Sequence, residues 1–314
     1  METQPLPLDR IGQRFSIRLH DPEGGYRDVV GQLNSANTVI DRHGNEKNFD
    51  PKLIAYWREV ISRPSAAGKG APLTLRVLEL DRICNATWPA IESEEFGGWL
   101  LRAANGVTNR ANSVLPLKGA LEAGCLNNFE ENLAAAQNFY RSRNLPVIFH
   151  LAIPTWDELQ SKLIELGSTE LIRANTMVAD LQSFEVNIPT GLTLEVTDTP
   201  TTAWLNTPAI PGVEKILNGC PARYLGIRSG AEVIATARIA LSEGWSSLTR
   251  VFVSEQFRGQ GLGKAIVASA INEGLLQGAT KSVLQVEAKN EVAIDIYESL
   301  GFNFHHEYTY LELT

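Results

Sequence analysis

Cysteine and histidine are scarce in the sequence, and neither is arranged for a metal or a disulfide framework. The three cysteines, Cys84, Cys125 and Cys220, are far apart and odd in number, which fits neither a set of paired disulfides nor a zinc site. Of the five histidines, only His305 and His306 are adjacent, and neighbours on a strand point to opposite faces. We therefore predict no metal, and we expect a cytoplasmic protein.

Long apolar runs and basic blocks are also missing. Residues 1–10 lack a basic segment followed by an apolar run, so we expect no signal peptide. No apolar stretch approaches the length of a membrane span. The net charge of −8, without a basic block, argues against a protein that holds nucleic acid by phosphate contacts. We expect neither a nucleic-acid nor a membrane partner, although an isolated basic pocket for a small acid remains compatible with this charge.

The remaining composition is that of an ordinary globular protein, with 44% hydrophobic and 20% charged residues. A chain of 314 residues suits two or three domains. Residues 1–62 contain short β-like runs between turns, such as Phe15-Ser16-Ile17-Arg18-Leu19, which predicts a small barrel. This unit resembles the Src-homology-type barrels, and we expect it to mediate docking or self-association. Residues 62–70, rich in Ser, Ala, Gly and Pro, form the expected linker.

Residues 71–190 and 191–314 show the same order of expected strands and helices, which predicts an α+β fold with a mixed sheet flanked by helices. In the first unit, Leu73–Val77 alternates like a strand and residues 79–88 are a helix candidate. In the second unit, residues 302–313 are expected to finish the fold as a strand pair. The alternative for the first unit is an unrelated α+β domain.

A glycine-rich turn in the second unit is the most informative stretch. An apolar strand, Leu248–Val253, leads into Gln256-Phe257-Arg258-Gly259-Gln260-Gly261-Leu262-Gly263, and a helix follows. Glycines let the backbone approach a bulky group, and the first N–H groups of a helix have no internal partner. These N–H groups and the helix dipole favour a phosphate, and Arg258 and Lys264 add positive charge.

The glycine spacing distinguishes between phosphate-binding loops. A dinucleotide fingerprint needs Gly-x-Gly-x-x-Gly near the first strand of a βαβ unit, and a Walker loop needs Ser or Thr where Ala265 stands. The run Gln256-x-x-Gly259-x-Gly261 instead resembles the Arg/Gln-x-x-Gly-x-Gly/Ala signature of the GCN5-related N-acetyltransferases (GNAT). The alternative is a tight glycine turn without a ligand. The resemblance implies that the loop and the strand before it bind acetyl-CoA through Val251, Phe252, Val253, Arg258, Gly259, Gln260, Gly261, Leu262, Gly263 and Lys264.

Acetyl transfer to an amine also needs a polarised thioester, a base for the ammonium and an acid for the leaving thiolate. The run from Asn290 through Tyr297 to Gly301-Phe302 resembles the second GNAT signature. The resemblance implies that Asn290 binds the cofactor arm and that the Tyr297 hydroxyl is the general acid. The alternative for Tyr297 is core packing.

The base is less clearly marked in the sequence. Glu287, just past the expected fifth strand, is the best candidate, and a surface carboxylate is its alternative. His305 and His306 are further options at the end of the sheet.

Two arginines raise the question of the acceptor. Arg238 and Arg250 fall on neighbouring central strands, where an unpaired arginine is costly. Either they pair with Glu232, Glu243 or Glu287, or one of them binds an acidic acceptor bidentately.

The order of features along the chain is also similar to an actinobacterial group described as N-acetylglutamate synthases of arginine biosynthesis. The match rests on the small barrel, Trp88-Pro89-Ala90, residues 98–114, and the ending His305-His306-x-Tyr308. The resemblance implies that residues 71–190 are a degenerate GNAT lobe without a cofactor site, that residues 191–314 are the catalytic GNAT domain, and that L-glutamate is the acceptor. Arg102, Arg110 and Asn112 are open to a binding role, with strand-end packing as the alternative.

Two other functions remain open at this point. One is acetylation of another amine, such as a protein N-terminus, a lysine or an aminoglycoside. The other is a non-catalytic acetyl-CoA sensor that uses the barrel for docking.

Overall fold

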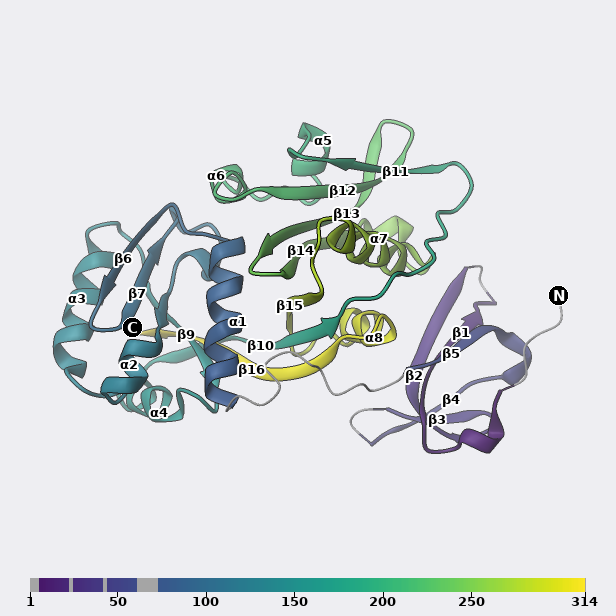
Figure 1. Cartoon of the computed structure of the whole chain (residues 1–314), viewed down its shortest axis with the longest axis horizontal. Coiled ribbons are helices and arrows are strands. Elements are labelled where there is room, and N and C mark those ends of the chain that lie inside the picture. Colours follow the sequence, from purple (N-terminus) through teal and green to yellow (C-terminus); the bar gives the residue numbers. More distant parts are fainter. Residues whose placement is uncertain (1–5, 23–24, 42–43, 61–72, 314) are drawn as a thin grey trace.

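The computed structural model describes residues 6–22, 25–41, 44–60 and 73–313 (Figure 1). The strands form two sheets, one of five strands at the N-terminus and one of eleven. The expected linker at residues 62–70 and part of the turn at residues 22–25 lie outside the described ranges.

The N-terminal sheet has the strand order β4-β3-β2-β1-β5, and every pairing in it is antiparallel. Its core is apolar, because Phe15, Ile17 and Leu19 alternate along β1 and are fully buried. The edge strands β4 and β5 are not paired with each other in the described residues, so the structure does not show the predicted barrel as closed. Its elements are η1 (Leu8–Arg10), β1 (Arg14–His20), β2 (Tyr26–Ser35), β3 (Thr38–Ile40), β4 (Glu46–Asn48), η2 (Pro51–Leu53) and β5 (Ile54–Glu59).

The eleven-stranded sheet runs through the rest of the chain in the order β11-β12-β13-β14-β15-β10-β16-β9-β8-β7-β6. It is mixed, since β14 and β15 are parallel and so are β8 and β9, and helices flank it, which confirms the predicted α+β class. The first half contains α1 (Leu73–Thr87), β6 (Glu92–Phe96), β7 (Trp99–Ala103), η3 (Asn109–Ala111), β8 (Val114–Pro116), α2 (Lys118–Ala123), α3 (Phe129–Arg141), β9 (Val147–Ile153), α4 (Asp157–Glu165) and β10 (Thr169–Asp180). The second half contains β11 (Leu192–Thr197), α5 (Thr202–Leu205), α6 (Glu214–Leu217), β12 (Ala222–Ser229), β13 (Glu232–Ser242), β14 (Trp245–Val253), η4 (Glu255–Phe257), α7 (Leu262–Leu276), β15 (Lys281–Glu287), α8 (Glu291–Ser299) and β16 (Asn303–Leu313).

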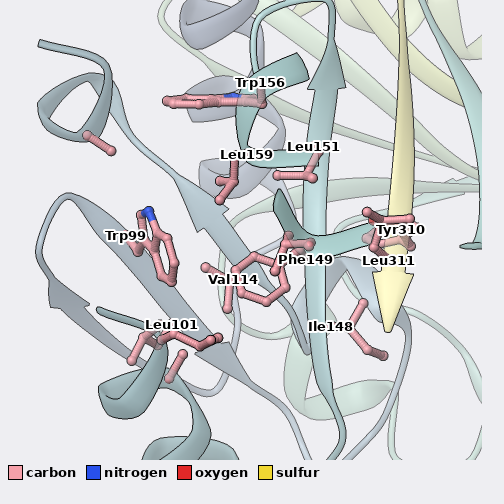
Figure 2. Close-up of a cluster of buried hydrophobic side chains, with 14 of the residues drawn as sticks. Trp99, Leu101, Val114, Ile148, Phe149, Leu151, Trp156, Leu159, Tyr310 and Leu311 are labelled. Carbon is pink, nitrogen blue, oxygen red and sulfur yellow. The ribbon is translucent and has the colours of Figure 1, made fainter. Parts of the chain in front are cut away.

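The two halves exchange their last strands. β10, which ends the first half, pairs with β15 of the second, and β16, which ends the second half, pairs with β9 of the first. β10 and β16 also pair with each other and join the two halves in Figure 1. As a result of this exchange, Tyr310 and Leu311 of β16 lie in the core of the first half with Phe149 (Figure 2).

The prediction of a strand at Leu73–Val77 is wrong, because these residues begin α1. The alternation of leucine with polar residues there matches a strand period, but the chain continues at helical spacing. Val77, Leu80, Ile83 and Cys84 are all buried and follow the i, i+3, i+4 pattern of one helix face. That face packs on the sheet at β13 and β14.

The end of the chain also differs from the prediction, since residues 303–313 form the single long strand β16 rather than a pair of strands. No helix in the described part of the chain is long and apolar enough to cross a membrane.

Candidate functional site

The site forms where β14 and β15 stop pairing. The parallel ladder between them extends from Trp245↔Lys281 to Leu248↔Leu284, whereas β14 continues along β13 to Val253. On the β15 side, the backbone groups of residues 251–253 therefore have no ladder partner among the described pairings. Unpaired strand groups of this kind can accept hydrogen bonds from, and donate them to, an extended ligand.

A β-bulge lies at the point of divergence. The register between β13 and β14 shifts between Thr236↔Phe252 and Arg238↔Thr249, and Arg250 has a left-handed backbone with φ of 56°. The buried Thr236 hydroxyl donates to the Arg250 carbonyl at 3.0 Å. Bulges turn side chains and backbone groups out of the regular ladder, so the strand changes direction beside the opened edge.

The glycine loop has the geometry of an anion site. Gly259 and Gly261 have φ of 76° and 79°, a region that side chains disfavour. Gly261 is the N-cap of α7, and no side chain of the described residues caps this helix. The helical bonds of α7 begin with Ala265 N–H, which donates to the Gly261 carbonyl at 3.0 Å. The N–H groups before it, at the positive end of the helix dipole, remain available to a phosphate.

The other predicted loop residues take different positions around this turn. Arg258 donates from Nε to the Val253 carbonyl at 3.3 Å, which ties the loop to the end of β14. Gln260 is exposed, and Leu262 is buried in the core beneath α7. Lys264 Nζ lies 3.7 Å from Asp28 of the N-terminal sheet. Burial lowers the pKa of Lys264 to about 8, even though Asp28 favours its charged form.

Helix α8 packs directly against the start of α7. A Cβ on Gly263 would lie 3.0 Å from Ile296 Cδ1, so a side chain there would require Ile296 to shift by a few tenths of an ångström. The next residue, Tyr297, is 7% exposed and meets the Phe302 ring edge-on with centroids 6.0 Å apart. Burial raises the pKa of Tyr297 well above its usual range, which keeps the phenol protonated. Asn290 is the N-cap of α8 and accepts from Ala293 N–H.

The candidate bases differ in exposure. Glu287 ends β15, is exposed and lies 3.3 Å from Lys289, a geometry that fits a surface carboxylate as well as a base. Contrary to the prediction, His305 and His306 do not point apart, because a register shift at this point of β16 brings their Nδ1 atoms to 2.8 Å. Burial lowers the pKa of His305 to about 4, with Arg76 contributing, and that of His306 to about 3. Both rings are therefore neutral at pH 7.

The two predicted acceptor-binding arginines do not use the expected glutamates in the described residues. Arg238 is fully buried and donates to the Thr87 carbonyl at 2.9 Å and to Cys220 Sγ at 3.1 Å. Arg250 donates from Nη2 to the Pro208 carbonyl at 2.6 Å and stacks over the Trp204 ring. Of the expected partners, Glu243 pairs with Arg82 and Glu287 with Lys289.

Packing explains the three polar residues of the first half. Asn112 Oδ1 accepts from the N–H groups of Ala104 and Gly106, and its Nδ2 donates to two carbonyls of the same loop. Arg102 donates to the Ser113 carbonyl and hydroxyl. Arg110 stacks over the Trp88 ring. These contacts support the packing alternative for all three.

A row of buried polar side chains beside the opened edge was not predicted from the sequence. Thr176 is the register partner of both Gln285 and His306. Each of these three side chains has a buried polar atom without a hydrogen-bond partner in the described structure, as does Arg76 Nε on α1. The available indication was polar residues inside otherwise apolar strands, because such groups need a partner once buried.

Comparisons with known proteins agree with this geometry. The family described as "Probable histone acetyltransferase Rv0428c C-terminal" matches residues 74–311. The chain is 25% identical over 325 residues to "Probable histone acetyltransferase Rv0428c" of Mycobacterium tuberculosis, covering 96% of this chain and 95% of the relative. It is 26% identical over 240 residues to "Uncharacterized N-acetyltransferase YobR" of Bacillus subtilis, covering 72% of this chain and 94% of the relative.

Among solved structures, a tandem GNAT protein from the clavulanic acid biosynthesis pathway aligns with a TM-score of 0.54 at 11% identity, covering 80% of this chain and 90% of that one. At this identity the likeness concerns the fold. The family match shows that the chain belongs to the Rv0428c C-terminal family. Together with the named relatives and the shared fold, this match shows that the chain is a GNAT-type N-acetyltransferase, an enzyme class whose co-substrate is acetyl-CoA.

Proposed function

We propose that this N-acetyltransferase moves the acetyl group of acetyl-CoA to the amine of a small acidic acceptor, with L-glutamate as the first candidate. The observation that carries the proposal is the divergence of β14 from β15 beside an uncapped α7 N-terminus. This arrangement offers backbone N–H groups to a diphosphate and a free strand edge to the pantetheine arm. The buried phenol of Tyr297 lies on the helix that packs against the same loop.

The reaction needs few groups from the protein. The free amine attacks the thioester carbonyl, a C–N bond forms, and the C–S bond breaks. Backbone groups of Val251–Val253 hold the acyl-pantetheine, and Asn290 supports the arm. The Tyr297 hydroxyl gives its proton to the departing thiolate and regains one from the nitrogen, which still carries an excess proton after the C–N bond forms. Burial raises the pKa of this phenol, so it carries its proton at neutral pH.

We assign the removal of the ammonium proton to Glu287, acting through a water. Its exposure at the end of β15 gives it contact with solvent. The neutral histidines His305 and His306 are the second choice, since burial makes both rings weak bases.

The arginines support an acidic acceptor. Arg250 is part-buried beside the bulge of β14, and burial lowers its pKa, which reflects the cost of holding its charge away from water. Its Nε is buried without a hydrogen-bond acceptor in the described structure. A substrate carboxylate would satisfy that donor and offset the charge. Arg238 has the same charge but is enclosed by Trp88 and Tyr224, so we place the direct contact at Arg250. Production of N-acetylglutamate would place the enzyme in arginine biosynthesis.

A protein amine is the second candidate, because the Mycobacterium tuberculosis relative is named a probable histone acetyltransferase. A protein acceptor requires an open approach to the acetyl group, whereas a carboxylate-bearing small molecule requires a cation within the site.

The test is an amine panel with acetyl-CoA, with CoA release followed by free-thiol detection. The panel includes L-glutamate, L-glutamine, which lacks the side-chain carboxylate, and a lysine-containing histone-like peptide. The proposal predicts turnover with glutamate that exceeds that with glutamine and falls in Arg250→Ala. Faster release with the peptide than with glutamate would replace the acidic acceptor by a protein amine.

A further inference from the structure

The N-terminal sheet is in direct contact with the glycine loop. Tyr26 N–H, at the start of β2, donates to the Gly259 carbonyl at 3.1 Å. A Cβ on the neighbouring Gly25 would lie 2.9 Å from that same oxygen. Arg14 of β1 also forms an ion pair with Glu298 of α8, and Figure 1 shows β2 beside α8. The sheet therefore contacts the loop at the Gly259 carbonyl.

This contact brings an arginine of the N-terminal sheet to the loop. Arg18 Nη1 lies 3.8 Å from the position that a Cβ on Gly261 would occupy. Asp28 orients the guanidinium, because its carboxylate accepts from Arg18 Nε at 2.9 Å and from Nη2 at 3.1 Å. A bidentate pair fixes the plane of an arginine. Arg18 Nη2 lies 4.0 Å from the same Cβ position, so the guanidinium that Asp28 holds lies beside the N-cap of α7.

Among the described residues, positive charge exceeds negative charge in this cluster. Asp28 pairs with Arg18 and lies 3.7 Å from Lys264, and the charges of Asp28 and Arg18 both act on Arg58 of β5. Arg58 Nε is buried without a hydrogen-bond acceptor in the described ranges, and its guanidinium stacks over Phe184. Burial lowers the pKa of both Arg58 and Lys264. Three cations around one carboxylate are thus held at a cost that an incoming anion would reduce.

We propose that the N-terminal sheet forms one wall of the coenzyme site, in which Arg18 binds the diphosphate of acetyl-CoA opposite the amides of the glycine loop. Arg58 and Lys264 supply the remaining positive charge. The inference rests on the proposed binding of acetyl-CoA at this loop. It gives the N-terminal unit a role in coenzyme affinity, beyond docking or self-association.

The experiment compares two donors in the full-length protein. Calorimetry measures the affinity for CoA in the wild type, in Arg18→Ala and in Arg10→Ala. Arg10→Ala is the matched control, since it removes the same charge from an exposed pair with Glu59 in the same sheet. Turnover is then measured with acetyl-CoA and with S-acetylpantetheine, which has no phosphates. We expect Arg18→Ala to weaken CoA binding by about tenfold to a hundredfold, the range for losing a charge-assisted hydrogen bond.

The phosphate-free donor separates binding from folding. We expect kcat/KM for S-acetylpantetheine to stay unchanged in Arg18→Ala, and Arg10→Ala to behave like the wild type with both donors. Unchanged CoA affinity in Arg18→Ala would overturn the inference, as would an equal loss with both donors, because the residue would then be structural. Failure of the wild type itself to bind CoA would instead remove the proposed function on which the inference rests.

Discussion

Substitution of Gly25 tests whether the N-terminal sheet must touch the glycine loop. Gly25 has φ of 89°, and a Cβ there would lie 2.9 Å from the Gly259 carbonyl oxygen. Gly25→Ala therefore combines two penalties. A left-handed backbone costs a residue with a side chain about 1 kcal/mol. Displacing the loop also breaks the Tyr26–Gly259 hydrogen bond, which contributes about 1 kcal/mol.

Gly12→Ala isolates the first penalty. Gly12 lies in the same N-terminal unit with φ of 91°, and no atom of the described residues lies within 4 Å of its Cβ position. Both variants should lose about 1 kcal/mol of stability through backbone strain, a shift of about 2–4 °C in Tm for a protein of this size. Only Gly25→Ala should also lose the loop contact, which corresponds to about fivefold weaker CoA binding if that contact positions Arg18.

The assay is calorimetric titration of both variants with CoA, together with thermal unfolding of each. Because the strain is matched, the ratio of the two dissociation constants reports the contact alone. Equal dissociation constants, with Gly25→Ala as destabilised as Gly12→Ala, would refute the reasoning that the sheet and the loop act together.

Three further predictions concern the proposed acid, the loop lysine and the buried histidines. Tyr297→Phe removes the proton donor but keeps the ring against Phe302. We therefore expect kcat, measured by free-thiol release, to fall by about a hundredfold or more, while CoA affinity, measured by calorimetry, changes less than about twofold. A loss of affinity as large as the loss of rate would contradict the acid role. Burial lowers the pKa of Lys264 to about 8, and a phosphate binds its charged form. CoA affinity should therefore weaken as pH rises through 8. A Lys264→Met variant whose CoA affinity has the same pH dependence as the wild type would contradict this role of Lys264. Burial lowers the pKa of His305 to about 4 and of His306 to about 3. Below pH 6.5 the unfolded chain therefore binds more protons than the folded chain. The free energy of unfolding should fall as pH drops from 6.5 towards 4. Chemical denaturation at several pH values should show a shallower fall in His306→Phe, and an unchanged slope would rule the ring out as a source.

Local patterns account for the parts of the fold and site that the sequence predicted. The glycine loop, the helix after it and the helix around Tyr297 depend on short-range spacing, and each occurs where the sequence placed it. The strand prediction for Leu73–Val77 failed because a pattern of five residues is too short to reveal the fifteen-residue helix that contains them. The face assignment of His305 and His306 failed because a bulge broke the alternation.

Other features depend on contacts between distant parts of the chain. Arg18 and Asp28 meet Lys264 only because the N-terminal sheet packs against the loop, and nothing in the spacing of residues 14–20 indicates that contact. The pairing of β10 with β15 and of β16 with β9 likewise follows from the whole sheet. The assignments of Glu287, Asn290 and the arginines to chemical roles remain predictions.

The exchange of β10 and β16 makes each half of the large sheet depend on the other for its hydrogen-bonded edge. Residues 169–180 leave the first half to complete the second, and residues 303–313 return from the second to complete the first. Neither half can therefore melt alone without exposing an unpaired strand and part of the other's core. We therefore expect the two halves of the sheet to unfold as a single cooperative unit.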